Sequence, residues 1–371
     1  MPTASQTPDV AIIGGGIVGC ALAYDLARQG VAVALYERRA IGREASWASA
    51  GIISPPGPRH GTRAELALLA YRRYPALIAE VQEATGIAVG YVPGGEIDLG
   101  TDESAAALRK TLAWQTERGM AAEWLDAREL RRREPAVHES YSCGLANIEA
   151  GSLLLARMTQ ALARAAARLG ARIHEHTSVQ DILLDGGRAI ALRTFDGDRP
   201  VGAVAIAAGA WSRTLGAAID LNIPTVPVRG QMLAIADPPI PIRSVLAGAG
   251  GYLVPRADGT IAVGATEEHE AGFDARVTTA GLAELHRLVE RIAPSLAQGR
   301  FVEAWAGLRP GTDHDELIVG RAPHLDNVWI STGHYRSGAL LAPATGELLA
   351  ASIINGRADD RLAAFDPARI A

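Results

Sequence analysis

Residues 9–37 of the chain read DVAIIGGGIVGCALAYDLARQGVAVALYE, and this stretch decides the fold. A short apolar run at Asp9–Ile13 predicts a buried strand. An apolar helical pattern follows over Ile17–Gln29, and Gly30 fits the left-handed position just after a helix end. Val31–Tyr36 is a second apolar run. The stretch therefore predicts a strand–helix–strand unit, and continuous rather than alternating hydrophobicity indicates a parallel sheet covered on both faces.

The glycines between this strand and helix follow the pattern Gly14-x-Gly16-x-x-Gly19. The first glycine permits a tight turn, the second lets backbone approach a pyrophosphate, and the third allows close packing of helix on strand. The helix N-terminus then offers unpaired N–H groups to phosphates. Glu37 ends the second strand, where a carboxylate accepts hydrogen bonds from ribose hydroxyls. Together these features predict dinucleotide binding, the alternative being a glycine-rich turn without a ligand.

Three features favour FAD over NAD as the dinucleotide. The glycine motif lies close to the N-terminus. A strand predicted at Val204–Ala208 runs into Gly209-Ala210-Trp211-Ser212, deep in the chain. A further glycine-bearing segment, Gly333–Gly338, precedes an apolar helix near the C-terminus. A long cofactor that crosses a whole domain needs contacts from such scattered segments.

The rest of the chain predicts a second sheet. Five segments show alternating or short apolar runs joined by Gly, Pro and Asp turns, which is typical of antiparallel strands. They are Ala88–Leu99, Val226–Ala236, Tyr252–Pro255, Ile261–Gly264 and Phe301–Trp305. Helical patterns cover Ala64–Thr85, in which Pro75 predicts a kink or a break, and also Glu103–Arg118, Ser152–Leu169 and a segment that contains Leu282–Ile292.

The order of these segments predicts an α/β protein with two discontinuous domains. We expect a Rossmann-type FAD-binding domain made of residues 1–87, 141–222 and 310–371. We expect a substrate-binding domain of α+β type, with a mostly antiparallel sheet, made of residues 88–140 and 223–309.

Composition excludes several classes of protein. The chain has 371 residues, 48% of them hydrophobic and 21% charged, as in ordinary globular proteins. The net charge of −5 comes without a basic stripe, so we expect no nucleic-acid partner. Two cysteines are too few for a disulfide framework, and no His and Cys pattern predicts a metal site. Without a signal peptide or a long apolar run, we expect a cytoplasmic protein with no integral membrane segment.

Several motifs resemble the D-amino-acid oxidase (DAO) family of FAD-dependent oxidoreductases, in particular its glycine oxidase branch, which is associated with thiamine biosynthesis. The resemblance covers nearly the whole chain. The segments that support it are Gly14–Gly19, Gly42–Gly51, Ala207–Ser212, Tyr252–Arg256, Val263–Thr266, Trp305–Thr312 and Gly333–Gly346.

The resemblance implies how FAD is held. Glu37 and Arg38 should hold the adenosine ribose region, and Val179 should offer its backbone to the adenine. The segment from His334 should enclose the pyrimidine side of the flavin, with Pro343 in the first turn of the next helix. The implied FAD-binding residues are Gly14, Gly16, Ile17, Val18, Gly19, Glu37, Arg38, Ala45, Ser46, Ala50, Gly51, Ile52, Val179, Gly209, His334, Tyr335, Arg336, Ser337, Gly338, Ala339 and Leu340.

The resemblance also implies a substrate site. Arg309 should bind the carboxylate of a small amino acid through a bidentate guanidinium, with Tyr252 and Arg336 as helpers. The implied reaction is the oxidation of glycine, sarcosine or small D-amino acids by hydride transfer to the flavin. Oxygen then takes the electrons to give hydrogen peroxide, and the imine product hydrolyses to an oxo acid and ammonia. In the plainer alternatives, Arg309 is a surface residue of a Pro-Gly turn and Tyr252 belongs to the core.

The chain departs from the family pattern at three places. No cysteine stands in Leu308–Thr312, so we expect the FAD to be non-covalent. Glu267-Glu268-His269 follows Ala265-Thr266 where an apolar residue is expected near the amine. Glu267 could bind an amine or belong to a solvated loop. Gly250-Gly251 also lacks the polar side chain that some glycine oxidases carry before the tyrosine, which leaves the preferred substrate open.

Other functions stay open at this point. The nearest is an FAD-dependent D-amino-acid dehydrogenase that passes electrons to a quinone or another acceptor. An NAD(P)-linked dehydrogenase and a flavin-binding module without activity are the other two. By analogy with the family, we expect a homo-oligomer.

Overall fold

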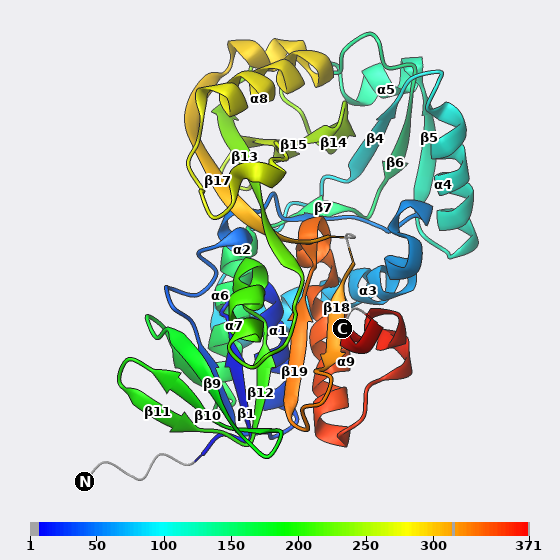
Figure 1. Ribbon diagram of the computed structural model, residues 1–371. Coiled ribbons are helices and arrows are strands. Elements are labelled where there is room, and N and C mark those ends of the chain that lie inside the picture. Colours follow the sequence, from blue (N-terminus) through cyan, green and yellow to red (C-terminus); the bar gives the residue numbers. More distant parts are fainter. Residues whose placement is uncertain (1–6, 314–315, 370–371) are drawn as a thin grey trace.

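The computed structural model describes residues 7–313 and 316–369. Its first part is built on a six-stranded sheet in the order β18-β19-β12-β1-β2-β8 (Figure 1). All neighbouring strands pair in parallel except β18 and β19. In chain order the strands are β1 (Val10–Ile13), β2 (Val33–Tyr36), β8 (Arg172–His174), β12 (Ala203–Ile206), β18 (Ile318–Arg321) and β19 (Val328–Thr332).

Both faces of this sheet are covered, as its continuous apolar strands predict. Val10 and Leu35 lie in the core on the face that four helices cover. These helices are α1 (Ile17–Arg28), α3 (Ala64–Thr85), α6 (Leu155–Arg168) and α9 (Gly338–Asn355). Ala11 and Tyr36 point to the opposite face, which α7 (Ser212–Ala217) and a three-stranded sheet cover. That sheet, β9 (Val179–Asp185), β10 (Arg188–Thr194) and β11 (Gly197–Pro200), was not predicted.

The second part is an eight-stranded sheet in the order β17-β13-β16-β15-β14-β4-β6-β5 (Figure 1). It is antiparallel except between β14 and β4. The strands are β4 (Glu96–Gly100), β5 (Ala122–Asp126), β6 (Cys143–Asn147), β13 (Thr225–Ala236), β14 (Val245–Gly248), β15 (Gly251–Pro255), β16 (Ile261–Gly264) and β17 (Arg300–Thr312).

The two faces of the large sheet have different partners. Leu253 and Val263 pack against Leu285 and Leu288 of α8 (Thr279–Ile292) on the outer face. Val254 and its neighbours in the sheet face the first part of the molecule, where they contact Ala48 and Ala50. Two further helices, α4 (Ala105–Glu117) and α5 (Ala127–Arg133), lie beside β5 and β6. The inner face of the large sheet is therefore the one whose side chains contact the part built on the six-stranded sheet.

The α/β fold class is confirmed, with a parallel sheet and a mixed, mostly antiparallel sheet. The division at residues 87, 140, 222 and 309 remains a prediction, and two strands do not follow it. β6 lies within 141–222 but pairs with β4 and β5 of the large sheet, and β17 extends past residue 309. A short helix, α2 (Ala45–Ala48), and a two-stranded sheet, β3 (Ile52–Ile53) with β7 (Gly151–Ser152), lie between the two parts.

The helices differ from the sequence predictions in three places. α3 is one helix of 22 residues that contains Pro75 and is not split. α6 begins at Leu155, and Ser152 lies in β7, where its hydroxyl donates to the Pro255 carbonyl at 2.9 Å instead of capping the helix.

Pro343 lies inside α9, which begins five residues earlier at Gly338, so its placement in the first turn was wrong. Pro343 has no N–H for the carbonyl of Ala339. The hydroxyl of Tyr74 on α3 donates to that carbonyl instead, so the helix continues through the proline. The segment Tyr335–Asn355 is long and apolar enough to cross a membrane, but 61% of its apolar window is buried inside the protein. α9 packs against α1 and α3, as a core helix does.

Candidate functional site

A cavity of about 1150 Å³ lies between the six-stranded sheet and the inner face of the eight-stranded sheet. It is larger than the roughly 300–1,000 Å³ typical of a small-ligand pocket. Of the predicted cofactor and substrate residues, all but Gly19 line it. The structure therefore brings together segments that lie up to 326 positions apart in the sequence, between Gly14 and Leu340.

The glycine loop has the close contacts that its pattern requires. A Cβ on Gly14 would lie 2.3 Å from the carbonyl oxygen of Ala207, at the end of β12, and Gly14 has a φ of 115°. A Cβ on Gly19 would lie 2.0 Å from the carbonyl oxygen of Gly14, so Gly19 serves the packing of α1 on β1 rather than the cavity lining. At Gly16 the nearest atom to a Cβ is the Ser46 hydroxyl at 3.5 Å, and the loop is open towards the cavity.

Glu37 and Arg38 stand at the end of β2, beside the glycine loop. The Glu37 carboxylate accepts the N–H of Gly15 at 2.7 Å and that of Arg39 at 2.8 Å, and the side chain is buried. A carboxylate has about four acceptor positions, so two stay free for ribose hydroxyls. The Arg38 guanidinium lies 3.7 Å from the centre of the Trp211 ring.

Two buried side chains on the cavity wall lack hydrogen-bond partners among the described residues. They are the Ser331 hydroxyl and Nε2 of His334, and both residues are about 2% exposed. Burial, with Arg63 nearby, lowers the pKa of His334 to about 3, so the ring is neutral. Unpaired buried polar atoms are rare in folded proteins. Because these atoms and the open glycine loop line one long cavity, the residues present fit an FAD.

The N-terminus of α9 points its first residues at the same cavity. Tyr335–Ser337 form a short 3₁₀ turn, and Gly338, Ala339 and Leu340 follow in the first turn of α9. The first N–H groups of a helix have no partner within it, and they carry a partial positive charge. This end of the cavity can therefore stabilise a negatively charged ring.

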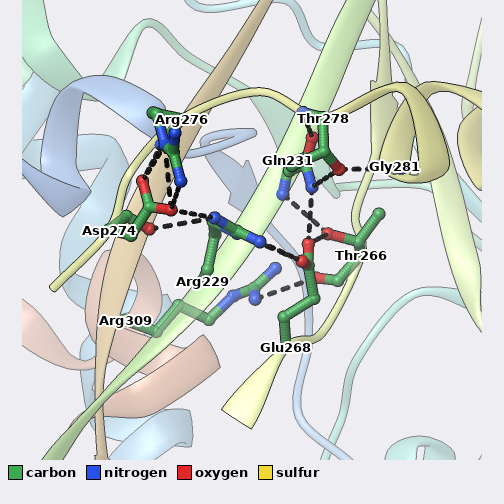
Figure 2. Close-up of polar contacts among 9 residues, drawn as sticks. All are labelled: Arg229, Gln231, Thr266, Glu268, Asp274, Arg276, Thr278, Gly281 and Arg309. Atoms are coloured by element: carbon green, nitrogen blue, oxygen red, sulfur yellow. Dashed lines mark hydrogen bonds and ion pairs between the residues drawn. The ribbon is translucent and has the colours of Figure 1, made fainter. Parts of the chain in front are cut away.

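Arg309 lies on β17 and is held in place by its neighbours across the sheet (Figure 2). Its Nη1 donates to the carbonyl oxygen of Thr266 at 3.1 Å. The guanidinium lies across Gly230 on β13, where a Cβ would be 2.4 Å from Nη1. In the described part of the chain, Thr266 is the one hydrogen-bond partner of this guanidinium. Most of its five N–H donors are therefore free for a ligand in the cavity.

A buried polar network fixes the loop that presents the Thr266 carbonyl (Figure 2). One oxygen of Glu268 accepts from the Thr266 hydroxyl and from Gln231 Nε2, both at 2.7 Å. The other oxygen accepts from Arg229 at 2.6 and 3.1 Å. Burial opposes ionisation of Glu268, but the hydrogen bonds from Arg229, Thr266 and Gln231 outweigh it and lower its pKa.

Asp274 completes this network from the far side of Arg229. Its carboxylate lies 3.1 Å from the Arg229 guanidinium. Hydrogen bonds from Arg276 hold the pKa of Asp274 well below its usual range. Arg229 and Glu268 point towards each other (Figure 2), and neither is among the residues that line the cavity. This network therefore supports the loop that holds Arg309 and does not itself line the ligand cavity.

Tyr252 and Arg336 also line the cavity, from opposite parts of the molecule. Tyr252 lies on β15, and Arg336 lies in the turn before α9. Glu267 lines the cavity too, where it forms an ion pair with Arg336 and accepts the hydroxyl of Tyr335. His269 Nε2 lies 3.3 Å from the same carboxylate. Glu267 is therefore an ion-paired residue of an exposed loop at the cavity wall, and its carboxylate already has partners where an amine would bind.

Sequence reasoning missed an acidic group on the wall of the cavity. Glu96 and Asp98 on β4 line it, as do Ser54 and Arg59. The alternation of acidic and apolar residues over 96–99 is the signal that could have found them, because it puts both carboxylates on one face of a strand. Among the described residues, no group of three His, Cys, Asp or Glu side chains is arranged to hold a metal ion.

The glycine loop on a parallel sheet, the unpaired polar atoms and the long cavity define a flavin-dependent oxidoreductase site. Residues 9–352 match the family model described as DAO, FAD dependent oxidoreductase. The chain therefore belongs to the DAO family, and its cofactor is FAD.

The chain is similar over nearly its whole length to named members of this family. It is 35% identical over 355 residues to glycine oxidase of Pseudomonas aeruginosa, which covers 94% of this chain and 95% of that protein. It matches the crystal structure of glycine oxidase from Geobacillus kaustophilus with a TM-score of 0.88 at 33% identity, over 98% of both chains. Iminodiacetate oxidase from Chelativorans sp. BNC1 has a TM-score of 0.86 at 28% identity, over 96% of this chain and 98% of that chain.

Proposed function

We propose that the protein oxidises the amino group of an α-amino acid, in the manner of a glycine oxidase. The observation that supports this most directly is Arg309. Its guanidinium lies on the wall of the flavin cavity, is held from behind by the Thr266 carbonyl, and keeps most of its donors free. A planar guanidinium matches a carboxylate through two parallel hydrogen bonds, which fixes the orientation of the whole amino acid.

The protein residues align the reactants in this proposal. Arg309 binds the substrate carboxylate. Tyr252 contacts the substrate from β15, and Arg336 contacts it from the turn before α9. Alignment of this kind contributes a large share of the rate in reactions without a protein base. Bound FAD supplies the chemistry by accepting a hydride from the substrate α-carbon and passing the electrons to oxygen as hydrogen peroxide. The imino acid then hydrolyses to an oxo acid and ammonia.

The predicted FAD contacts are part of the same proposal. Glu37 would bind the ribose, the N–H of Val18 would face the pyrophosphate, and Val179 would lie beside the adenine. The N–H of Ile17 donates to the Ser46 hydroxyl at 2.9 Å, so Ile17 would contribute as part of the cavity wall. The segment from His334 to Leu340, which lines the cavity, would hold the pyrimidine side of the flavin. We propose that FAD is held without a covalent bond, because both cysteines are buried and neither Cys20 nor Cys143 is among the described residues that line the cavity. Precipitation with acid should then release all of the yellow cofactor into the supernatant.

The experiment that tests the activity is anaerobic mixing of the holoenzyme with glycine, sarcosine, D-alanine and D-proline. Bleaching of the flavin followed by peroxide formation in air is the expected result. Arg309→Ala should lower kcat/KM by roughly 100-fold or more with FAD retained, because it removes a charge-assisted pair worth about 2–5 kcal/mol. Arg300→Ala, at the exposed end of the same strand, is the matched control. Unchanged kcat/KM in Arg309→Ala would refute the role of Arg309, and bleaching without peroxide would favour a dehydrogenase.

A further inference from the structure

A second group of buried polar side chains lines the flavin cavity away from Arg309. Glu96 and Asp98 are 4% and 7% exposed and stand on the same face of β4. Asp98 pairs with Ala247 on β14, and Ala247 pairs with Tyr252 on β15. These three residues form one row across the sheet, with side chains on the inner face. Since neighbouring strands are about 4.8 Å apart, Asp98 lies roughly 10 Å from Tyr252.

The charges in this group do not balance. The Arg59 guanidinium lies 3.2 Å from Asp98, and the hydroxyl of Ser54 donates to Glu96. Among the described residues, Arg59 is the one cation that contacts either carboxylate, so Glu96 has no positive partner of its own. Burial, with Asp98 nearby, raises the pKa of Glu96 to about 7. His60 also lines this region, and burial together with Arg59 lowers its pKa to about 4, so it adds no charge.

Asn147 beside Glu96 is a second sign that this region awaits a ligand. It lies directly across from Glu96 on β6, so the two side chains share the inner face of the sheet. Asn147 is 1% exposed, and neither its amide oxygen nor its amide nitrogen has a hydrogen-bond partner in the described parts of the chain. A wholly unpaired buried amide is rare in folded proteins. The region therefore holds both an unbalanced carboxylate and hydrogen-bonding capacity that the protein itself does not use.

We propose that the cavity-lining residues Ser54, Arg59, Glu96 and Asp98, with Asn147 buried beside Glu96, form a basic-side-chain subsite. The substrate is then an amino acid with a second amino or a guanidino group. This inference rests on the proposed function, because it takes the carboxylate of the same substrate to lie at Arg309. Carboxylates bind ammonium and guanidinium groups through charge-assisted hydrogen bonds. A cation there also offsets the cost of burying Glu96.

The length of the subsite suits such a substrate. Basic amino acids carry their charge on an apolar stem of about three or four methylene groups. The side chains between Tyr252 and Asp98 on this face, such as Ala247, are small and apolar, so a stem can lie over them. Glycine or alanine, held at Arg309 and Tyr252, would leave Glu96 without its partner.

The first test compares ornithine with norleucine, which has the same shape but ends in a methyl group. Both enantiomers of each are mixed anaerobically with the holoenzyme, and flavin reduction is followed. We expect kcat/KM for ornithine to exceed that for norleucine by at least tenfold. In Glu96→Gln the ratio of the two values should fall by at least tenfold, whereas the exposed control Glu103→Gln should keep it. Equal values for both compounds in the wild type, or an unchanged ratio in Glu96→Gln, would overturn the subsite.

The second test measures binding without turnover, so that failure of the subsite is distinguishable from failure of the proposed function. The holoenzyme is titrated calorimetrically with 5-aminopentanoate, which is ornithine without its α-amino group, and with hexanoate, which has a methyl group in place of the terminal amine. We expect 5-aminopentanoate to bind at least tenfold more tightly in the wild type and to lose this advantage in Glu96→Gln. If no amino acid bleaches the flavin, the proposed function fails. If small amino acids bleach it but ornithine is not preferred over norleucine, nor 5-aminopentanoate over hexanoate, the subsite alone fails.

Discussion

Gly230 on β13 makes room for Arg309 on β17, because a Cβ on Gly230 would lie 2.4–2.5 Å from three atoms of the guanidinium. The two residues are neighbours on one face of the sheet, since Arg309 pairs with Val228 and Gly230 pairs with Gly307. A long side chain can lie flat across an adjacent strand only where that strand has no side chain. The position of the Arg309 guanidinium is thus set by a glycine 79 positions away in the sequence.

Gly230→Ala should therefore displace the guanidinium without removing it. We expect kcat/KM for amino acids to fall by roughly tenfold or more, mostly through KM, while FAD content stays unchanged, since misplacement of a binding group is costly. Combined with Arg309→Ala, the glycine variant should cause little further loss, because the side chain that it displaces is gone. Full additivity of the two changes would contradict this relationship.

Glu267→Gln tests the pair that Glu267 forms with Arg336. Glu267 places a carboxylate on the wall of a cavity that takes the substrate carboxylate in the proposed function, and it forms an ion pair with Arg336. An amide keeps the shape, removes the repulsion and frees Arg336 for the substrate. We expect KM for amino acids to fall by roughly three- to tenfold, as expected for loss of a partly exposed like charge. Glu270→Gln, an exposed neighbour outside the cavity lining, should leave KM unchanged. A raised KM in Glu267→Gln would show that the ion pair positions Arg336 instead.

Glu96→Gln should change how stability depends on pH. Burial raises the pKa of Glu96 from an ordinary 4.5 to about 7. The folded protein therefore holds this proton more tightly than the unfolded chain does. The contribution of Glu96 to stability is fully present below pH about 4.5 and is lost as the pH rises through about 7.

Glutamine at position 96 cannot ionise, so the variant should lack this loss. We expect it to gain up to about 3 kcal/mol on the wild type between pH 5 and pH 8, measured by chemical unfolding of the holoenzyme without added substrate. Glu103→Gln should track the wild type at both pH values. If Glu96→Gln and the wild type had parallel pH profiles, Glu96 would not be the buried acid described here.

The hydrogen bond from Tyr74 to the Ala339 carbonyl predicts a coupling with Pro343. Tyr74→Phe leaves a buried carbonyl unpaired and should lower the free energy of unfolding by about 1–3 kcal/mol. In a Pro343→Ala background, the new N–H can donate to the same carbonyl, so the loss caused by Tyr74→Phe should be smaller. A double-mutant cycle measured by denaturant unfolding checks this, and equal losses in both backgrounds would rule out the coupling.

Much of the FAD-binding part could be predicted because its signals are local. The order of strand, glycine loop and helix over residues 9–37 depends on short-range rules, and the structure shows β1, α1 and β2 there within two residues of the predicted ends. The placement of Pro343 failed for the opposite reason. The carbonyl of Ala339, which Pro343 leaves without a helical donor, accepts a hydrogen bond from Tyr74 on α3. The sequence around the proline does not predict this contact.

The candidate site could be predicted only in part. Arg309, Tyr252 and the flavin segments carry recognisable motifs, and all of them line one cavity. Gly230, Glu268 and Asn147 carry none, because their roles depend on which strands become neighbours in the large sheet. The strands β4 and β14 lie about 150 positions apart in the sequence and pair in parallel. The short turns between the other strands predict antiparallel pairing, so the sequence gives no sign of this pair.

The sequence by itself determined the fold of the nucleotide part, the family and the residues that carry charge. These follow from glycine spacing, hydrophobic periodicity and residue chemistry, each of which acts over a few neighbouring positions. Only the tertiary structure decided which charges are paired and which face a ligand. In the structure Arg229 pairs with Glu268, whereas Arg309 keeps most of its N–H donors free, and Glu96 is buried without a cation of its own. These differences arise only on folding, because the strength of charge interactions and hydrogen bonds depends on burial and on distance.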